Sequence, residues 1–276
     1  MTLGVTVRRR IYYSVAAAAA FVAVAWLQAD YAAALHRPRF FDGWVLLTGV
    51  LFLTLFNLRK KLPMLPLGGA RSWTQIHVYT GYFILGVFLL HTGFGLPQGA
   101  LDSGLWIVFV TVVLSGVAGL TLSRIVPLRL GEARERILLE RIPGFRQQLA
   151  REVAEIAQRS VGEEGSLTIS SFYADTIHEF MQGPRNFLAH VSGSHRALLA
   201  ITAGIDRLER YVDDKGMETL SQIRERVIAK NDLDFQYANL MLLRLWLFFH
   251  IPATYGLIIM AAVHVAVVYA YNSGAP

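Results

Sequence analysis

Five apolar stretches alternate with polar segments along the chain, and each is long enough to form a helix that crosses a bilayer. They cover about residues 11–29, 41–58, 73–96, 104–122 and 239–271. A helix needs roughly 20 mainly apolar residues to cross a hydrocarbon core about 30 Å thick. The pattern therefore predicts five transmembrane helices, four in residues 1–122 and the fifth in residues 239–276.

Residues 123–238 form a polar insertion between the fourth and fifth stretches. Apolar side chains recur there at three- and four-residue steps, which is the spacing of an amphipathic helix: Leu138, Ile142, Phe145, Leu149, Val153 and Ile156. Similar spacing appears at 168–181, 195–211 and 220–228, with Gly- and Pro-containing turns between the pieces. No strand pattern stands out. We expect an all-α membrane protein with a small helical bundle as its insertion.

The distribution of charge argues against nucleic-acid binding and predicts an orientation in the membrane. The chain has 26 Lys and Arg against 20 Asp and Glu, but residues 123–238 hold 16 against 17, so the excess belongs to the membrane flanks. The basic runs 8–10 and 59–61 fall on one side of the membrane if the five helices alternate. The positive-inside rule then predicts a plasma-membrane protein with a cytoplasmic N-terminus, a cytoplasmic insertion and an outer C-terminus.

The first stretch also has the features of a signal peptide. Basic residues precede an alanine-rich core, and the small residue Ala29 ends it. A cleaved first segment therefore stays an alternative to a first transmembrane helix, and it leaves the topology of the other four helices unchanged.

Two histidine pairs are the main candidates for chemistry. His77 and His91 in the third stretch, and His250 and His264 in the fifth, share a fourteen-residue spacing. Fourteen residues of α-helix advance about 21 Å and return to within about 40° of the same face. Each helix would thus present two imidazoles on one side, near opposite surfaces of the bilayer. Such helices facing each other are suited to two stacked metal centres, such as haems with two axial histidines each.

The two histidine helices share more than this spacing. Both read R-x-W-x3-H-x4-Y-x8-H, beginning at Arg71 and Arg244, with Trp73 and Trp246 two residues later. A guanidinium at this edge can pair with a haem propionate, or with a lipid phosphate. The tryptophans lie one turn before a histidine, but tryptophan is also common at any membrane interface. Cofactor binding and membrane anchoring are both open for these four residues.

Gly81 and Gly95 each follow a histidine of the third helix by four residues. Such gaps admit a flat macrocycle between close helices, although glycines also serve plain helix packing in membranes. The chain has no cysteine, which excludes thiolate-ligated iron–sulfur clusters, zinc–cysteine sites and thioether-attached haem.

Topology predicts which histidines share a metal. The third and fifth helices run in the same direction, so equivalent residues lie at equal depth. His77 is expected to pair with His250 on the cytoplasmic side, and His91 with His264 on the outer side. The helix rise predicts a separation of about 20 Å between the two iron atoms.

The paired H-x13-H helices resemble those of transmembrane dihaem b-type cytochromes. These include the four-helix core of quinol-oxidising cytochrome b and the membrane domain of ferric reductases and NADPH oxidases. The resemblance covers roughly residues 41–124 and 239–271. It implies a four-helix core around two haem b groups and an electron-transfer subunit linked to a quinone pool or a cytoplasmic donor. The chain shows no Gly-rich dinucleotide motif and no quinol-site loop, so a partner, such as a flavin or iron–sulfur subunit, would supply further cofactors.

A different class of function is also open. The chain would then be a membrane scaffold or sensor, with structural or zinc- or copper-binding histidines and a signalling cytoplasmic bundle. Two imidazoles per site are an incomplete set for a bare ion. The iron or zinc content of the protein separates these two hypotheses.

Overall fold

The computed structural model describes residues 4–34, 38–61, 69–131, 138–160 and 166–272, and this part of the chain contains helices and turns but no strands. Contacts divide the chain into two compact units. Unit 1 comprises Met1–Leu120 and Leu247–Pro276, and unit 2 comprises Thr121–Trp246. The predicted all-α class is confirmed.

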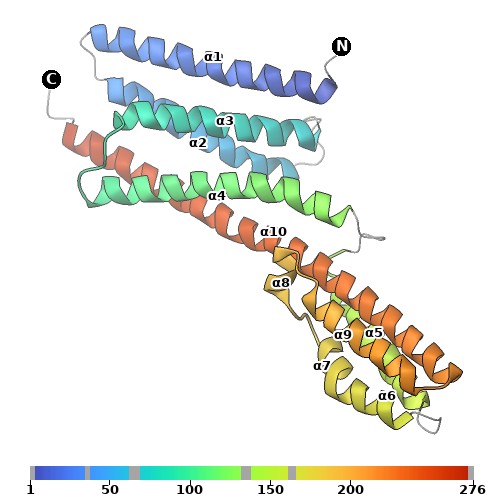
Figure 1. The fold of residues 1–276 in the computed structure, drawn as a ribbon. Helices are drawn as coiled ribbons and strands as arrows, with labels where there is room; N and C mark the ends of the chain where they lie inside the picture. Colours follow the sequence, from blue (N-terminus) through green and yellow to red (C-terminus); the bar gives the residue numbers. More distant parts are fainter. Residues whose placement is uncertain (1–3, 35–37, 62–68, 132–137, 161–165, 273–276) are drawn as a thin grey trace. The chain divides into compact units, whose positions relative to one another are not determined.

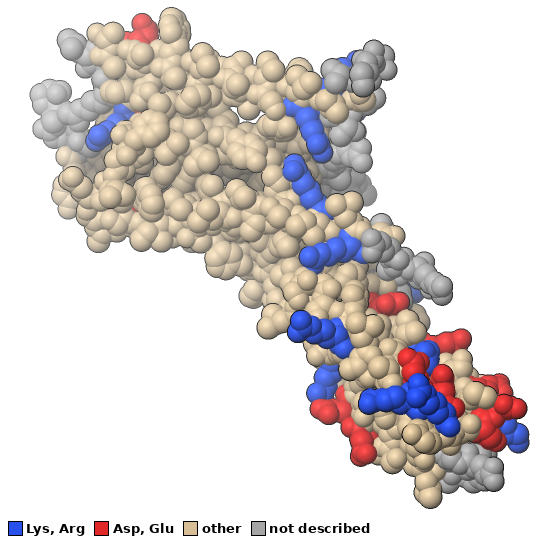
Figure 2. Space-filling view, in the orientation of Figure 1, with Lys and Arg blue, Asp and Glu red and all other residues tan. Residues whose placement is uncertain are grey.

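Five of the helices are long and apolar enough to cross a membrane. They are α1 (Val5–Ala33), α2 (Pro38–Lys61), α3 (Ala70–Thr92), α4 (Ala100–Leu130) and α10 (Asp214–Asn272). Figure 1 shows α1 to α4 and the C-terminal part of α10 together in unit 1, with α2 and α3 between α1 and α10. In Figure 2 the surface of unit 1 is mostly uncharged, whereas Lys, Arg, Asp and Glu gather on unit 2. These features are those of a multi-pass membrane protein.

Helix α3 ends earlier than the apolar pattern predicts. Its last residue is Thr92, whereas the expected end was near residue 96. Gly93 and Phe94 both adopt positive φ angles, of 60° and 58°. The Phe94 N–H donates to the carbonyl of Leu89 and the Gly93 N–H to that of Leu90. This left-handed cap satisfies the last carbonyls of the helix and ends it. Apolar composition alone does not reveal such an end.

Helix α10 begins much earlier than expected. The fifth apolar stretch predicted a start near residue 239, but the structure has one continuous helix of 59 residues from Asp214. The segment 220–228, expected as a separate piece of the insertion, is therefore part of the same helix. No Gly or Pro lies between Met217 and Pro252, and Pro252 itself lies inside the helix.

Unit 1 is held together by close helix packing. Helix α3 packs most extensively against α2 and α1. A Cβ atom added at Gly49 of α2 would lie 1.9 Å from Cδ1 of Ile84, and one added at Gly86 of α3 would lie 2.8 Å from the ring of Phe21. These glycines therefore permit the close approach of α3 to its two neighbours, which is a common means of helix association in membranes.

Four helices of unit 1 share one buried apolar cluster. It contains Val50 of α2, Ile84 and Phe88 of α3, Phe109 of α4 and Leu257 of α10. The rings of Phe88 and Phe109 stack with a centroid distance of 3.9 Å. The cluster places α2, α3, α4 and α10 around a common interior.

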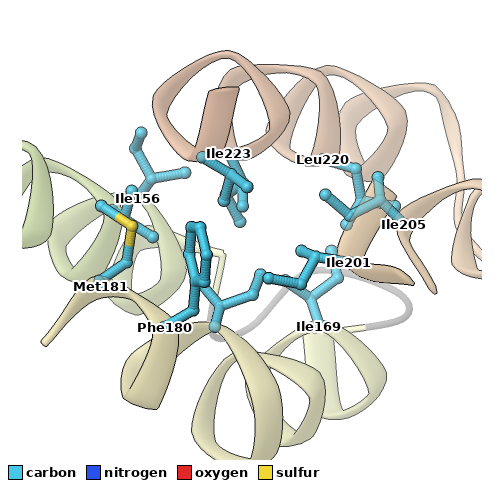
Figure 3. Close-up of a cluster of buried hydrophobic side chains, with 11 residues drawn as sticks. Ile156, Ile169, Phe180, Met181, Ile201, Ile205, Leu220 and Ile223 are labelled. Carbon is cyan, nitrogen blue, oxygen red and sulfur yellow. The ribbon is translucent and has the colours of Figure 1, made fainter. Parts of the chain in front are cut away.

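Unit 2 is a helical bundle with its own core. Its shorter elements are α5 (Ile142–Arg159), α6 (Ser166–Phe172), a π-helical turn (Tyr173–Ile177), α7 (His178–Met181), α8 (Phe187–Ser192), α9 (Arg196–Leu208) and a 3-10 turn (Glu209–Tyr211). Side chains from α5, α6, α7, α9 and the first part of α10 point toward one another in Figure 3. The predicted amphipathic spacing is visible in α5, where Ile142, Val153 and Ile156 are buried.

A buried charged network links α5 to α10 in unit 2. The carboxylate of Asp234 accepts a hydrogen bond from Arg146 at 3.1 Å and another from Nζ of Lys230 at 2.6 Å. The Lys230 side chain is fully buried, and the other two side chains are at most 6% exposed. The ammonium of Lys230 also lies 4.1 Å from the ring centre of Phe180. Buried charges need such pairing because desolvation penalises each of them strongly.

His190 of α8 lies near the same network and is only 3% exposed. Neither of its ring nitrogens has a hydrogen-bond partner among the described residues. Burial lowers the pKa of His190 below its usual 6.5. Asp234 opposes this shift, and the charges of Lys230 and His195 add to it. The imidazole is therefore neutral in the folded bundle near pH 7.

Replacing Asp234 should destabilise unit 2 strongly. Asp234→Asn leaves the charges of Arg146 and Lys230 buried without a counter-charge, a loss of about 3–5 kcal/mol for buried pairs. We expect a thermal unfolding midpoint lower by roughly 10 °C, measured by circular dichroism on the solubilised full chain. Glu225→Gln on the same helix is the control, because its side chain is 73% exposed. Equal midpoints for the two variants would contradict the structural role given to Asp234.

Acidification should destabilise the bundle through His190. Its pKa is lowered in the folded state, so the unfolded chain binds the proton more readily and stability is lost as the pH falls below about 6.5. His190→Leu should reduce the drop in unfolding midpoint between about pH 8 and about pH 5.5. His178→Leu, at an exposed position, should leave that drop unchanged. An identical drop in wild type and His190→Leu would show that other groups cause the pH dependence.

Candidate functional site

Each histidine of α3 in the membrane unit lies within electrostatic range of one histidine of α10. The imidazole of His77 lies within electrostatic range of His250. The imidazole of His91 likewise lies within electrostatic range of His264. Each pair joins one side chain of α3 to one of α10, and all four residues belong to unit 1.

Helix α4 contacts the first histidine of α10. Oγ of Ser115 lies 2.9 Å from Nδ1 of His250. A Cβ atom added at Gly116 would lie 3.8 Å from Cε1 of the same imidazole. Ser115 therefore fixes one ring nitrogen, and Gly116 leaves room for the ring against α4. In metal-binding histidines, such a bond at one nitrogen orients the ring so that the other nitrogen can bind the metal.

Helix α4 contacts the second histidine of α10 as well. Nδ1 of His264 lies 3.1 Å from Oδ1 of Asp102, whose side chain is 50% exposed. A carboxylate only accepts hydrogen bonds, so this contact places the imidazole proton on Nδ1. The lone pair of His264 is then on Nε2, the nitrogen that is left to act as a metal ligand.

The histidines of α3 lie against α2. The ring of Phe56 lies 5.0 Å from the ring of His77, and a Cβ atom added at Gly43 would lie 3.4 Å from Cε1 of His91. Nδ1 of His77 and Nδ1 of His91 are buried and have no hydrogen-bond partner among the described residues. An unsatisfied buried polar atom costs about 1–3 kcal/mol. The same two rings also have backbone hydrogen bonds to α2, His77 with Leu53 and His91 with Arg39.

An apolar layer lies between the two histidine pairs. Ile84 is the midpoint of the spacing in α3, and Leu257 is the midpoint in α10. Both belong to the buried cluster with Val50, Phe88 and Phe109. The two imidazole pairs are therefore separate sites with a packed interior between them.

The structure gives less information about the arginines and tryptophans that the sequence predicted at the site. The side chain of Arg71 lies outside the described part of the structure, and Trp73 is half-buried on α3. Arg244 is exposed and Trp246 is half-buried, and both fall in unit 2 rather than with the histidines. The cofactor roles predicted for these four residues stay predictions.

The two predicted glycine gaps differ in the structure. Gly81 has open space where a Cβ would lie, which agrees with a gap on α3. Gly95 lies beyond the end of α3 at Thr92, so the expectation that it provides a gap along that helix is wrong. The glycines that lie against imidazoles are instead Gly43 and Gly116.

Two functional candidates escaped the sequence reasoning. Ser115 and Asp102 lie on α4, which carries no histidine, and they contact His250 and His264. They are thirteen residues apart, close to the fourteen-residue spacing of the histidines. This similar spacing is the one signal in the sequence that points to Asp102 and Ser115. A helix that runs antiparallel to α10 would present contacts to its two histidines at nearly the same interval.

A cavity of about 520 Å³ lies between α2 and α3, and none of the four histidines lines it. Its walls are mainly apolar and aromatic: Phe41, Trp44, Val45, Thr48, Gly49, Phe52, Thr80 and Phe83. Among the described residues, no group of three or more His, Asp or Glu side chains forms a closed site for a metal ion.

No protein-family model matches the chain, and neither does any curated protein or solved structure.

Proposed function

We propose that the chain is a membrane electron-transfer subunit that holds two b-type haems. One haem would lie between His77 and His250, and the other between His91 and His264. The observation that supports the proposal is that each α3 imidazole lies within electrostatic range of one α10 imidazole, which gives two matched pairs.

The residues fit two such groups. Each pair would supply two imidazoles to hold one haem. Nδ1 of both α10 histidines is occupied by α4, through Ser115 and Asp102, which favours Nε2 as the ligand atom. The buried Nδ1 atoms of His77 and His91 show that the α3 imidazoles still have unsatisfied polar atoms. Gly43 and Gly116 leave space beside two of the rings.

A haem held by two histidines would supply one-electron transfer rather than chemistry on a bound substrate. The role of this chain is then to hold the imidazoles at fixed orientation and to exclude water between the two sites. Ile84, Phe88 and Leu257 provide that apolar separation.

The orientation of the chain in the membrane is inferred from its sequence. The basic flanks favour a plasma-membrane orientation in which the His77 end faces the cytoplasm and the His91 end faces outward. Electrons would pass between a quinone pool or cytoplasmic donor and a redox partner, such as a flavin or iron–sulfur subunit. Unit 2 is large enough to serve as the docking part for that partner.

A reduced-minus-oxidised absorption spectrum of the purified full chain tests the proposal. We expect a b-type haem signal and two haems per chain after expression with ample haem. Metal analysis should give iron rather than zinc or copper. A protein without haem iron, or one with bound zinc instead, would rule out the electron-transfer proposal in favour of a scaffold or sensor.

Single substitutions test the pairing. His77→Ala and His250→Ala should each leave one haem per chain, and the two spectra should match because the same haem is lost. His91→Ala and His264→Ala should match each other and differ from the first pair. His178→Ala, in unit 2, is the control and should keep both haems. Matching losses for His77→Ala and His264→Ala would contradict the proposed pairs.

A further inference from the structure

Charge is unevenly distributed within unit 2. Three of its segments, residues 121–130 of α4, 187–196 around α8 and 239–246 of α10, together hold four arginines and no acidic residue. The rest of the unit holds 13 Lys and Arg against 17 Asp and Glu. We call these three segments the basic end of unit 2. Its arginines are Arg124, Arg129, Arg196 and Arg244.

Contacts join the three segments of the basic end. Nη1 of Arg129, near the end of α4, donates a hydrogen bond to the backbone carbonyl of Val191 in α8. The rings of His190 and His195 each lie 6.3 Å from the ring of Phe235, which lies on α10 one turn before the third segment. Helix α8 is therefore held against both α4 and α10.

The basic end belongs to the parts of α4 and α10 that adjoin their apolar stretches. Helix α4 has 31 residues and is about 46 Å long at roughly 1.5 Å per residue, which exceeds a hydrocarbon core of about 30 Å. Its apolar stretch ends near residue 122, and that of α10 begins near residue 239. Residues 121–130 and 239–246 are therefore expected near the level of the lipid headgroups.

The basic end also exposes large apolar side chains. Leu188 of α8 is 79% exposed, and Leu128 of α4 and Leu245 of α10 are 75% and 47% exposed. Single exposed leucines are common on protein surfaces, but these three lie in the same segments as the arginines. Four of the six residues of α8 are apolar. Apolar and cationic side chains together suit a bilayer interface, where the first enter the acyl region and the second meet phosphates.

Three of the four arginines are available for such a contact. Arg124, Arg196 and Arg244 are exposed and form no salt bridge with any residue that the structure describes. Elsewhere in unit 2, Arg224 and Arg226 pair with carboxylates. A guanidinium can bind a phosphate through two parallel hydrogen bonds, and an anionic membrane surface attracts nearby basic side chains.

We propose that the basic end of unit 2 binds anionic phospholipids, with α8 in the membrane interface and the side chain of Leu188 in the acyl region. Arg196 and Arg244 bind the lipid phosphates, and Arg129 holds α8 in place through the carbonyl of Val191. The acidic remainder of unit 2 faces away from the lipid, since like charges repel. This lipid site is independent of the proposed haem function.

The position of α8 can be measured with one spin label, because the chain has no cysteine. Leu188→Cys is labelled in the full chain, which is reconstituted into vesicles of phosphatidylcholine and phosphatidylglycerol. Leu167→Cys is the matched control, because Leu167 is 85% exposed and lies on α6, at the opposite end of unit 2 from α8 (Figure 1).

The label at position 188 should collide more with dissolved oxygen, which concentrates in lipid, than with a water-soluble nickel chelate present on both sides of the membrane. The label at position 167 should show the reverse preference. A label at position 188 that prefers the chelate would place α8 in water. That result would leave its exposed surface to a partner protein and overturn the proposal.

The headgroup preference is tested by adding lipid to the detergent-solubilised full chain. Phosphatidylglycerol should raise the thermal unfolding midpoint, whereas phosphatidylcholine and inorganic phosphate should not. Arg196→Gln and Arg244→Gln should each raise the concentration of phosphatidylglycerol for half of this effect by about fivefold. Arg210→Gln is the control and should leave it unchanged, because Arg210 is exposed and lies at the other end of α9 from Arg196.

Each contrary result identifies a different error. An equal rise with inorganic phosphate would indicate a plain anion site, and an equal rise with phosphatidylcholine a lipid contact without charge preference. Either result overturns the proposed preference for anionic lipid. Equal concentrations for Arg196→Gln, Arg244→Gln and wild type would exclude the basic end as the binding surface. None of these measurements requires bound haem, so a chain without haem leaves the lipid site open to the same tests.

Discussion

A polar ring inside an apolar helix bundle needs a partner for its nitrogen atoms, and this requirement organises unit 1. Four imidazoles lie among helices whose other interior side chains are mainly apolar. Helix α4 satisfies Nδ1 of His250 through Ser115 and Nδ1 of His264 through Asp102. On the α3 side, Nδ1 of His77 and Nδ1 of His91 have no hydrogen-bond partner among the described residues.

The parts of this arrangement that depend on local pattern were predictable from the sequence. Apolar length revealed the five long helices, and the repeated histidine spacing marked α3 and α10 as the helices that carry the candidate site. Partners on α4 were not predictable, because the register of α4 against α10 depends on side-chain packing. The contact of Gly104 with Met260, where an added Cβ would lie 2.9 Å from the methionine methyl, is part of that packing.

Helix ends were predicted less well, since they depend on single backbone conformations. Two consecutive left-handed residues end α3 at Thr92, although apolar residues continue beyond it. Helix α10, in contrast, is longer than its apolar stretch, because its polar first part packs in unit 2 through Leu220, Ile223 and Val227. The composition changes along this helix while the backbone stays regular. A boundary placed where apolar character begins therefore missed its true start.

The apolar layer around Ile84 and Leu257 has a consequence for energy coupling. Its buried members are Val, Ile, Phe and Leu side chains, which have no group that can bind or pass a proton. Under the proposed function, an electron crossing this layer would move without a compensating proton. The step would then work with or against the membrane voltage, at up to about 2.3 kcal/mol for each 100 mV if the full membrane is crossed. A packed hydrocarbon interior would thus make the protein sensitive to the electrical state of the cell.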